Sequence, residues 1–262
     1  TQTNYKDGKL EGLEEEYFKN EQLRIKRNYK DDKLEGPKEE YYENGQLKFT
    51  YLFENDKIVN GSYKGYHENG VLEFEKKIKN GFVDGSYKRY HENGQISIRC
   101  SYNSKSLKSE FEKLKKIEWI RFGIPEGLWE EFYNNGQIKK NYIYEDTKIK
   151  DGMYREFFRK GQIKSEENYK NGLLYGVQKT FYQTGIIKSV KKILNNEEYP
   201  KLRKYFNVDG ILTYERIPKD NTLIIKEYYL NGQVKSITYD KGDLYDKELW
   251  EFYENGKLKS KK

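Results

Sequence analysis

A repeat of about 24 residues runs along the 262-residue chain and constrains its fold more than any other feature. Glu43–Leu47, Glu68–Leu72 and Glu92–Ile96 are near copies of one another. The central glycine of this segment, here called the turn glycine, recurs at Gly45, Gly70, Gly94, Gly136, Gly161, Gly185, Gly210, Gly232 and Gly256, and Glu21 replaces it in a first copy. The chain is therefore predicted to be an array of one small structural unit.

Each copy carries the same apolar signature around its turn glycine. An aromatic residue lies four positions before it, at Tyr17, Tyr41, Tyr66, Tyr90, Phe132, Phe157, Phe181, Phe206, Tyr228 and Phe252. An aliphatic residue lies two positions after it, at Leu23, Leu47, Leu72, Ile96, Ile138, Ile163, Ile187, Leu212, Val234 and Leu258. A second glycine lies nine positions before it in seven copies. One copy cannot cover its own apolar side chains, so stability must come from stacking neighbours.

Composition favours strands and turns over helices. The chain holds no alanine, the best helix former, but has 26 tyrosines and 22 glycines. Only 35% of residues are hydrophobic and the mean hydropathy is -1.12, values typical of disorder. Aromatic residues at 16% favour a folded chain instead. No apolar run is long enough to span a membrane, since a span needs about 18 residues or more.

The turn glycine follows asparagine in six copies, which predicts β-hairpins. Asn-Gly suits a two-residue type I′ turn, because both central residues need a positive φ. The link to the next copy, as in Asn171–Gly176, holds two more glycines and reads as a second turn. We therefore predict an all-β fold, an elongated and twisted antiparallel β-meander of about ten to eleven hairpin repeats.

A two-residue turn also predicts which side chains share a face of the sheet. The aliphatic residue after the turn would lie with residues six positions further on, and this face is the predicted core: Phe53, Ile78, Tyr102, Tyr144, Tyr169 and Ile193. The other face would gather the aromatic residues beside a ladder of cations: Arg24, Lys48, Lys139, Lys164, Lys188, Lys235 and Lys259. A three-residue turn with a bulge would change this facing.

Two stretches depart from the repeat. The interval between Gly94 and Gly136 is 42 residues, and we interpret residues 103–120 as a degenerate copy. A short helix over Ser106–Glu118 is the alternative. Copies at about 195–222 are irregular, with Pro200 and Pro218 interrupting them. Because the repeat spans the full length, residues 1–262 are predicted to form a single repeat domain.

The hairpin and link sequences point to a known family. The first reads aromatic-aromatic-Glu-Asn-Gly-Gln-Leu-Lys, as at Tyr41–Lys48, and the second reads Asn-Gly-x-Leu-x-Gly, as at Asn171–Gly176. Together they resemble MORN repeats, specifically the bacterial MORN-variant type, over essentially the whole chain. The resemblance is weaker near Gly210.

This resemblance implies an elongated twisted antiparallel sheet used for protein–protein contacts, scaffolding or dimerisation, and in some members for membrane attachment. Bacterial variants are often labelled antitoxin-like. A phosphatidylinositol-phosphate kinase label would reflect repeat similarity alone, since no kinase part is present in this sequence.

Candidate catalytic and metal-binding residues have simpler interpretations. His67 and His91 occupy the same place in adjacent copies and could in principle hold a metal, but tyrosine takes that place in other copies, so a ring in a stack is the favoured interpretation. Cys100 has no histidine near it in the repeat register and is interpreted as a small buried hydrophobe.

Glu-Glu pairs such as Glu39-Glu40 recur with the repeat beside many lysines, which indicates solvated charge pairing rather than glycosidase chemistry. The sequence lacks phosphate-loop, dinucleotide and kinase motifs. We expect no enzyme activity, no catalytic residues, no cofactor and no metal site.

The predicted binding face combines the aromatic positions with the cation ladder. Its residues are Tyr41, Lys48, Phe132, Lys139, Phe157, Lys164, Phe181, Lys188, Tyr228 and Lys235. Such a face suits a protein partner or, as an alternative, an anionic membrane or phosphoinositide surface. The other interpretation is that these lysines cover aromatic rings and block aggregation at strand edges.

The net charge of +7 is spread over mixed signs, so a polyanion-binding tail and a nucleic-acid partner are not expected. The function predicted from the sequence is a non-enzymatic scaffold for protein–protein interaction, with membrane attachment and an antitoxin-like role as alternatives and a homodimer as a further expectation. The chain starts at Thr1 rather than Met, so we expect that an N-terminal segment has been trimmed. The sequence predicts a bacterial protein but does not distinguish an exported or cell-surface location from a cytoplasmic one.

Overall fold

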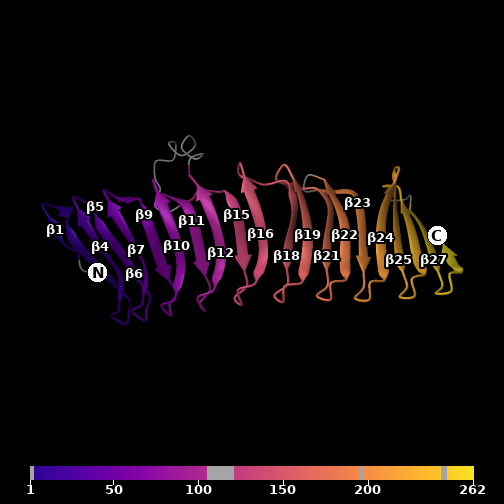
Figure 1. The fold of residues 1–262 in the computed structure, drawn as a ribbon, viewed down its shortest axis with the longest axis horizontal. Helices are drawn as coiled ribbons and strands as arrows, with labels where there is room; N and C mark the ends of the chain where they lie inside the picture. Colours follow the sequence, from indigo (N-terminus) through magenta and orange to yellow (C-terminus); the bar gives the residue numbers. More distant parts are fainter. Residues whose placement is uncertain (1–2, 105–120, 195–196, 243–246) are drawn as a thin grey trace. The chain divides into compact units, whose positions relative to one another are not determined.

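The computed structural model describes residues 3–104, 121–194, 197–242 and 247–262. All regular elements in these ranges are β-strands (Figure 1). The chain divides into two compact units: Thr1–Gln137 with Ile143–Thr147, and Ile138–Tyr142 with Lys148–Lys262. The predicted all-β meander of hairpin repeats is confirmed, whereas one domain over residues 1–262 stays a prediction.

The first unit begins with a separate two-stranded hairpin and continues as a meander. Its strands are β1 (Tyr5–Lys6), β2 (Lys9–Leu10), β3 (Gly12–Tyr17), β4 (Leu23–Lys30), β5 (Lys33–Leu34), β6 (Gly36–Tyr41), β7 (Leu47–Glu54), β8 (Lys57–Ile58), β9 (Gly61–Tyr66), β10 (Leu72–Lys79), β11 (Phe82–Tyr90), β12 (Ile96–Asn103), β13 (Arg121–Phe122), β14 (Ile124–Pro125) and β15 (Gly127–Phe132). Neighbouring strands pair antiparallel, except for a short parallel contact of β11 with β13.

The second unit repeats the same arrangement. β16 (Ile138–Glu145) is divided between the units, and the strands that follow are β17 (Lys148–Ile149), β18 (Gly152–Phe157), β19 (Ile163–Lys170), β20 (Leu173–Leu174), β21 (Gly176–Phe181), β22 (Ile187–Leu194), β23 (Glu197–Phe206), β24 (Leu212–Lys219), β25 (Thr222–Tyr228), β26 (Val234–Asp240), β27 (Lys247–Phe252) and β28 (Leu258–Lys261). Their described pairings are antiparallel and follow chain order (Figure 1).

The turn-glycine loops hold three residues, so the predicted two-residue type I′ turn is wrong at this end of the hairpin. In the second copy, the Tyr42 N–H donates to the Gln46 carbonyl and the Gly45 N–H donates to the Tyr42 carbonyl. The positive φ falls on Gly45 at 81°, not on Asn44. This is the hydrogen-bonding pattern of a type I turn followed by a bulged glycine. The same bonds recur in the other copies.

A β-bulge follows each of these loops and resets the register. Tyr41 pairs with Leu47, but Glu40 pairs with Phe49, so Lys48 is an extra residue in β7. The prediction that the aromatic residue lies beside the cation on one face, which assumed that the two residues pair across the turn, is therefore wrong. Because a bulge places two residues opposite one, the alternation of side chains between the two faces of the sheet is reversed beyond the bulge.

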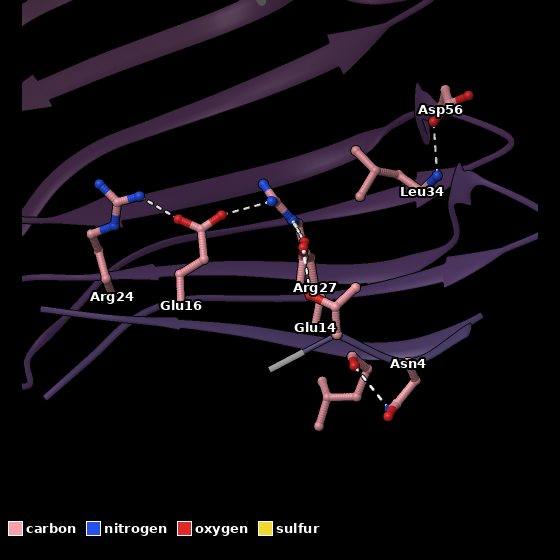
Figure 2. Close-up of polar contacts among 9 residues, drawn as sticks. Asn4, Glu14, Glu16, Arg24, Arg27, Leu34 and Asp56 are labelled. Atoms are coloured by element: carbon pink, nitrogen blue, oxygen red, sulfur yellow. Dashed lines mark hydrogen bonds and ion pairs between the residues drawn. The ribbon is translucent and has the colours of Figure 1, made fainter. Parts of the chain in front are cut away.

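Two-residue turns with positive φ at both central positions lie instead at the links. Asn55 and Asp56 have φ of 50° and 65°, and Asn171 and Gly172 have 55° and 79°. These values fit type I′ turns. Acidic side chains tie successive links together, since the Leu34 N–H donates to Asp56 at 2.7 Å (Figure 2).

The apolar core lies on one side of the sheet, here called the tyrosine face. All buried apolar residues that the structure describes share it: Tyr51, Tyr63, Ile78, Val83, Tyr87, Cys100, Tyr102, Tyr154 and Ile193. Seven of them form two clusters in the first unit, around Ile78 and around Val83. Tyr51 and Tyr63 rings lie 5.1 Å apart, and Tyr87 meets Tyr102 edge-on at 5.9 Å. Aromatic pairs thus lie both between neighbouring hairpins, as for Tyr51 and Tyr63, and within one hairpin, as for Tyr87 and Tyr102.

The predicted core face is correct in its far half and wrong near the turn. Phe53, Ile78, Tyr102, Tyr144, Tyr169 and Ile193 do lie on the tyrosine face, as the register and the ring contacts show. Leu47 and its equivalents lie on the opposite side with the aromatic residues that precede the turn glycine. The bulge at Lys48 separates the two sets.

Polar side chains on the loops bridge one hairpin to the next. Asn44 donates to the Glu68 carbonyl at 2.9 Å and accepts from the Gln46 N–H. The Tyr42 hydroxyl donates to the Tyr66 carbonyl at 3.0 Å, and Nε2–H of His67 donates to the Tyr90 carbonyl at 2.9 Å. His67 therefore takes the hydrogen-bonding role that tyrosine has at this position, whereas its stacking stays a prediction. His91 bonds the Phe132 carbonyl in the same way.

The first hairpin carries ion pairs where later hairpins carry tyrosines. Glu14 and Arg27 pair across β3 and β4, at the register position of Tyr63 and Lys76. Glu16 bridges Arg24 and Arg27 (Figure 2). The hydrogen bond from Arg24, with the charge of Arg27, holds the pKa of Glu16 below its ordinary value despite partial burial.

The two irregular stretches differ in outcome. Residues 105–120, which hold most of the degenerate copy and the alternative helix Ser106–Glu118, lie outside the described residues. In the irregular copies at 195–222, β23 and β24 still pair antiparallel, with the loop at Gly210 and a register shift next to Phe206. Pro218 is accommodated within β24.

Candidate interaction surface

The side of the sheet opposite the tyrosine face, here called the charged face, carries one continuous row of mostly charged residues in each unit. The row consists of the residues six positions before and five positions after each turn glycine, which pair both within and between hairpins. In the first unit the row is Glu15, Lys26, Glu39, Thr50, Lys64, Glu75, Lys88, Arg99 and Glu130. In the second unit it is Asn141, Arg155, Glu166, Lys179, Val190, Lys204, Glu215, Lys226, Ile237, Trp250 and Lys261.

Three glutamates of this charged row each bridge two cations on the neighbouring strands. Glu75 lies 3.3 Å from Lys64 and 3.9 Å from Lys88. Glu166 lies 3.1 Å from Arg155 and 3.7 Å from Lys179, and Glu215 lies 3.3 Å from Lys204 and 3.4 Å from Lys226. We call these groups the cation triplets, and each has a net charge of +1.

The carboxylates of the triplets are more buried than the cations around them. The Glu215 side chain is 7% exposed, whereas Lys204 is 39% and Lys226 is 30% exposed. Burial acts to raise the pKa of Glu215, but hydrogen bonds from Tyr228 and Lys204 outweigh it and hold the pKa below its ordinary value. Glu75 shows the same balance, with bonds from Tyr90 and Lys64. In each triplet the glutamate stays ionised near the sheet, and the two more exposed cations give the outer surface a positive charge.

The aromatic residues of the predicted binding face lie on the charged face, beside the charged row. The Tyr41 hydroxyl donates to Glu39 at 2.7 Å, and burial together with this bond raises the pKa of Tyr41 to about 12. Tyr228 donates to Glu215 of the preceding hairpin. Phe132, Phe157 and Phe181 occupy the same register position.

The lysines of the predicted binding face lie elsewhere. Lys48 and Lys164 occupy the bulge after the turn and pair with Glu40 and Glu156 at 2.7 and 2.8 Å. Lys235 pairs with Glu227 at 3.9 Å. Lys188 lies 5.6 Å from the Tyr182 ring centroid, and Lys139 takes the equivalent sequence position in its own copy. The bulge directs these side chains to the tyrosine face, so they do not line one surface with Tyr41, Phe132, Phe157, Phe181 or Tyr228.

The charged row is the feature that the sequence analysis missed. A usable signal was present, because the residues at these two positions alternate in sign over parts of the chain, as in Lys64, Glu75 and Lys88. This signal can be interpreted only when the three-residue loop and the bulge are known, because they set the register in which the two positions pair.

The tyrosine face holds a thiol and an amine whose pKa values are strongly shifted by burial. Burial raises the pKa of the Cys100 thiol to about 12, which keeps it protonated and unreactive. Its interpretation as a small buried hydrophobe is confirmed. Burial also lowers the pKa of Lys76 to about 8, while its ammonium lies 4.4 Å from the Phe74 ring centroid and 5.4 Å from that of Tyr51. Both groups pack within the aromatic layer.

Within the described ranges, no three His, Cys, Asp or Glu side chains gather closely enough to hold a metal ion. The part of the chain that the structure describes also has no apolar helix of bilayer-spanning length.

Comparison with protein families identifies the repeat. The model of the MORN repeat variant family matches residues 10–31, 34–55, 59–80, 83–104, 125–146, 150–171, 222–240 and 250–262. These segments cover more than half of the chain, which therefore belongs to the MORN repeat variant family. Residues 172–221 are not matched, although β21 to β24 keep the same hairpin geometry.

Other comparisons add little. Comparison with curated proteins gives no match. Among solved structures, the complex TcdB2-TccC3-Cdc42 is 10% identical with a TM-score of 0.20, covering 94% of this chain and 13% of that one. The Photorhabdus luminescens Tc holotoxin pore is 10% identical with a TM-score of 0.18, covering 94% and 16%. This chain spans less than a fifth of the length of these structures.

Proposed function

We propose that this protein is a non-enzymatic scaffold that binds a protein partner through its charged face. The observation that supports the proposal is the charged row, in which the glutamates of the cation triplets already have partners while the flanking cations stay partly exposed. A repeated hairpin presents this pattern many times on one surface, and arrays of this kind use extended surfaces for binding.

The test is affinity capture with the full chain, cross-linked to proteins in a lysate of the cells that produce it. Lys88→Glu with Lys204→Glu alters the charged face, and Lys48→Glu with Lys164→Glu makes the same charge change at the bulges. We expect one or more proteins to be captured by the wild type and by the bulge variant but not by the charged-face variant. Equal capture by both variants, or no specific capture, would contradict the proposal.

Vesicle co-sedimentation separates this function from membrane attachment. We expect no more binding to vesicles rich in anionic phospholipid than to neutral vesicles at physiological salt, because Lys48 and Lys164 are paired with glutamates. Binding to anionic vesicles that is lost with Lys139→Glu, Lys164→Glu and Lys188→Glu together would favour attachment to a lipid surface instead.

A further inference from the structure

In the second unit, a cation stands on every second strand of the charged row. Arg155 lies on β18, Lys179 on β21, Lys204 on β23 and Lys226 on β25. The residues between them in the row are Glu166, Val190 and Glu215. Paired strands lie about 4.8 Å apart, so successive cations are about 9.6 Å apart and the four together span about 29 Å.

Each of these cations has an aromatic residue beside it on the same face. The aromatic residue lies two positions further along the same strand, at Phe157, Phe181, Phe206 and Tyr228. Residues two apart in a strand point the same way. The second unit therefore presents four equal steps, each made of one cation and one aromatic ring.

The charge of these steps favours an acidic ligand. Four cations share two glutamates, and their side chains are 43%, 41%, 39% and 30% exposed from Arg155 to Lys226. A lysine ammonium has three N–H donors and an arginine guanidinium has five, so each cation can donate a hydrogen bond to a further carboxylate. The equivalent positions of the first unit, Glu15, Glu39, Lys64, Lys88 and Glu130, are of mixed sign and offer no such series.

We propose that this surface of the second unit binds an acidic polypeptide segment in the polyproline II conformation, with a carboxylate at every third residue. A polyproline II helix has three residues per turn and rises about 3.1 Å per residue, so its third residues share one side at intervals of about 9.3 Å. This period matches the cation spacing, and rings beside the cations suit prolines or other apolar residues between the carboxylates. The inference rests on the proposed function and specifies the chemistry of the partner.

The test uses two fluorescent, C-terminally amidated peptides with the same number of glutamates at different periods. One repeats Glu-Pro-Pro four times, and the other repeats Glu-Pro-Pro-Pro four times, so both carry four carboxylates and the second is longer by four prolines. We expect the full chain to bind the first peptide about tenfold more tightly by fluorescence anisotropy at low salt, because only the first keeps its carboxylates on one side. Equal affinity for the two peptides, or no binding of either, would overturn the proposal.

Matched variants locate the site. Lys179→Glu with Lys204→Glu should weaken binding of the Glu-Pro-Pro peptide about tenfold, and Lys179→Gln with Lys204→Gln should weaken it less, in keeping with a charge effect. Lys64→Glu with Lys88→Glu, the same change in the first unit, should alter it by less than about twofold. Circular dichroism melts check that each variant is folded. An equal loss with the first-unit variant would overturn the assignment of the site.

The outcome is separable from that of the proposed function. If a captured protein depends on the charged face but neither peptide binds, the scaffold function stands and the polyproline II period is wrong. If no protein depends on the charged face, the scaffold function itself fails.

Discussion

The two faces of this sheet are built by the same strands but use their side chains differently. On the tyrosine face, Ile78 is 2% exposed and is enclosed by Tyr51 and Tyr63 from adjacent hairpins. On the charged face, Lys204 stays 39% exposed although it pairs with Glu215. Neighbour packing on one face therefore supplies most of the stability, which leaves the other face free to carry a repeated charge pattern. Mutations on the two faces should separate these roles.

The largest expected effect is on the tyrosine face. Ile78→Ala removes a buried side chain next to two tyrosine rings, and we expect a loss of about 3 kcal/mol in the free energy of unfolding, measured with urea. Leu52→Ala is the matched control, because Leu52 is 45% exposed on the charged face and should change stability by less than about 0.5 kcal/mol. Similar losses for the two variants would contradict the division of roles.

A smaller loss is expected at Gly65, where the Phe74 ring lies directly over the backbone. A Cβ at this position would overlap the ring of Phe74, whereas a Cβ at Gly61 on the same strand would meet the Tyr63 ring at an ordinary 3.8 Å. Gly65→Ala should therefore destabilise the protein by about 2 kcal/mol through overpacking, and Gly61→Ala should be neutral or slightly stabilising by about 0.5 kcal/mol. Thermal melts of both variants test this contrast, and a stable Gly65→Ala protein would show that Phe74 moves freely.

Sequence alone was enough to predict the hairpins and the family. The turn glycine recurs at fixed spacing, with an aromatic residue before it and an aliphatic residue after it. This pattern predicts that the two strands of each copy pair with each other as a hairpin. The register was not predictable in the same way. Asn-Gly suits a type I′ turn, but Asn44 is used to bridge to the next hairpin, and only Gly45 takes a positive φ.

One extra residue at the bulge explains why the candidate site was only half correct. Tyr41 was placed beside Lys48 because a two-residue turn would pair them, whereas Lys48 is the extra residue of the bulge and its ammonium forms an ion pair with Glu40. A shift of one residue moves a side chain to the other face. The aromatic half of the predicted site therefore stayed on the charged face, and its cations had to be found in Lys179, Lys204 and their equivalents.

A charge change on the charged face should affect acid sensitivity more than stability. The pKa of Glu215 is lower in the folded chain than its ordinary value, so its ion pairs stabilise the fold above the unfolded pKa of about 4.3 and are lost as the pH falls through the folded pKa. Glu215→Gln should cost about 1 kcal/mol at pH 7. Its stability should also fall less steeply than that of the wild type between about pH 5 and 3.

Urea unfolding across this pH range measures both effects, with Glu227→Gln as the control, because Glu227 is 50% exposed and lies 3.9 Å from Lys235. If the free energy of unfolding of Glu215→Gln depended on pH in the same way as that of the wild type, the carboxylate of Glu215 would not contribute to the acid transition.

The smallest effect is expected from removing one hydroxyl of the charged face. Tyr228→Phe deletes the donor to Glu215 but keeps the ring beside Lys226, so stability should fall by about 0.5 to 1 kcal/mol while the charge series is unchanged. Binding of the Glu-Pro-Pro peptide should stay within about twofold of the wild type, whereas Tyr228→Ala should weaken it further by removing the ring. Anisotropy titrations of the two variants distinguish these outcomes. If Tyr228→Phe weakened binding as much as Tyr228→Ala, the peptide would contact the hydroxyl of Tyr228, and the aromatic ring would not contribute to binding.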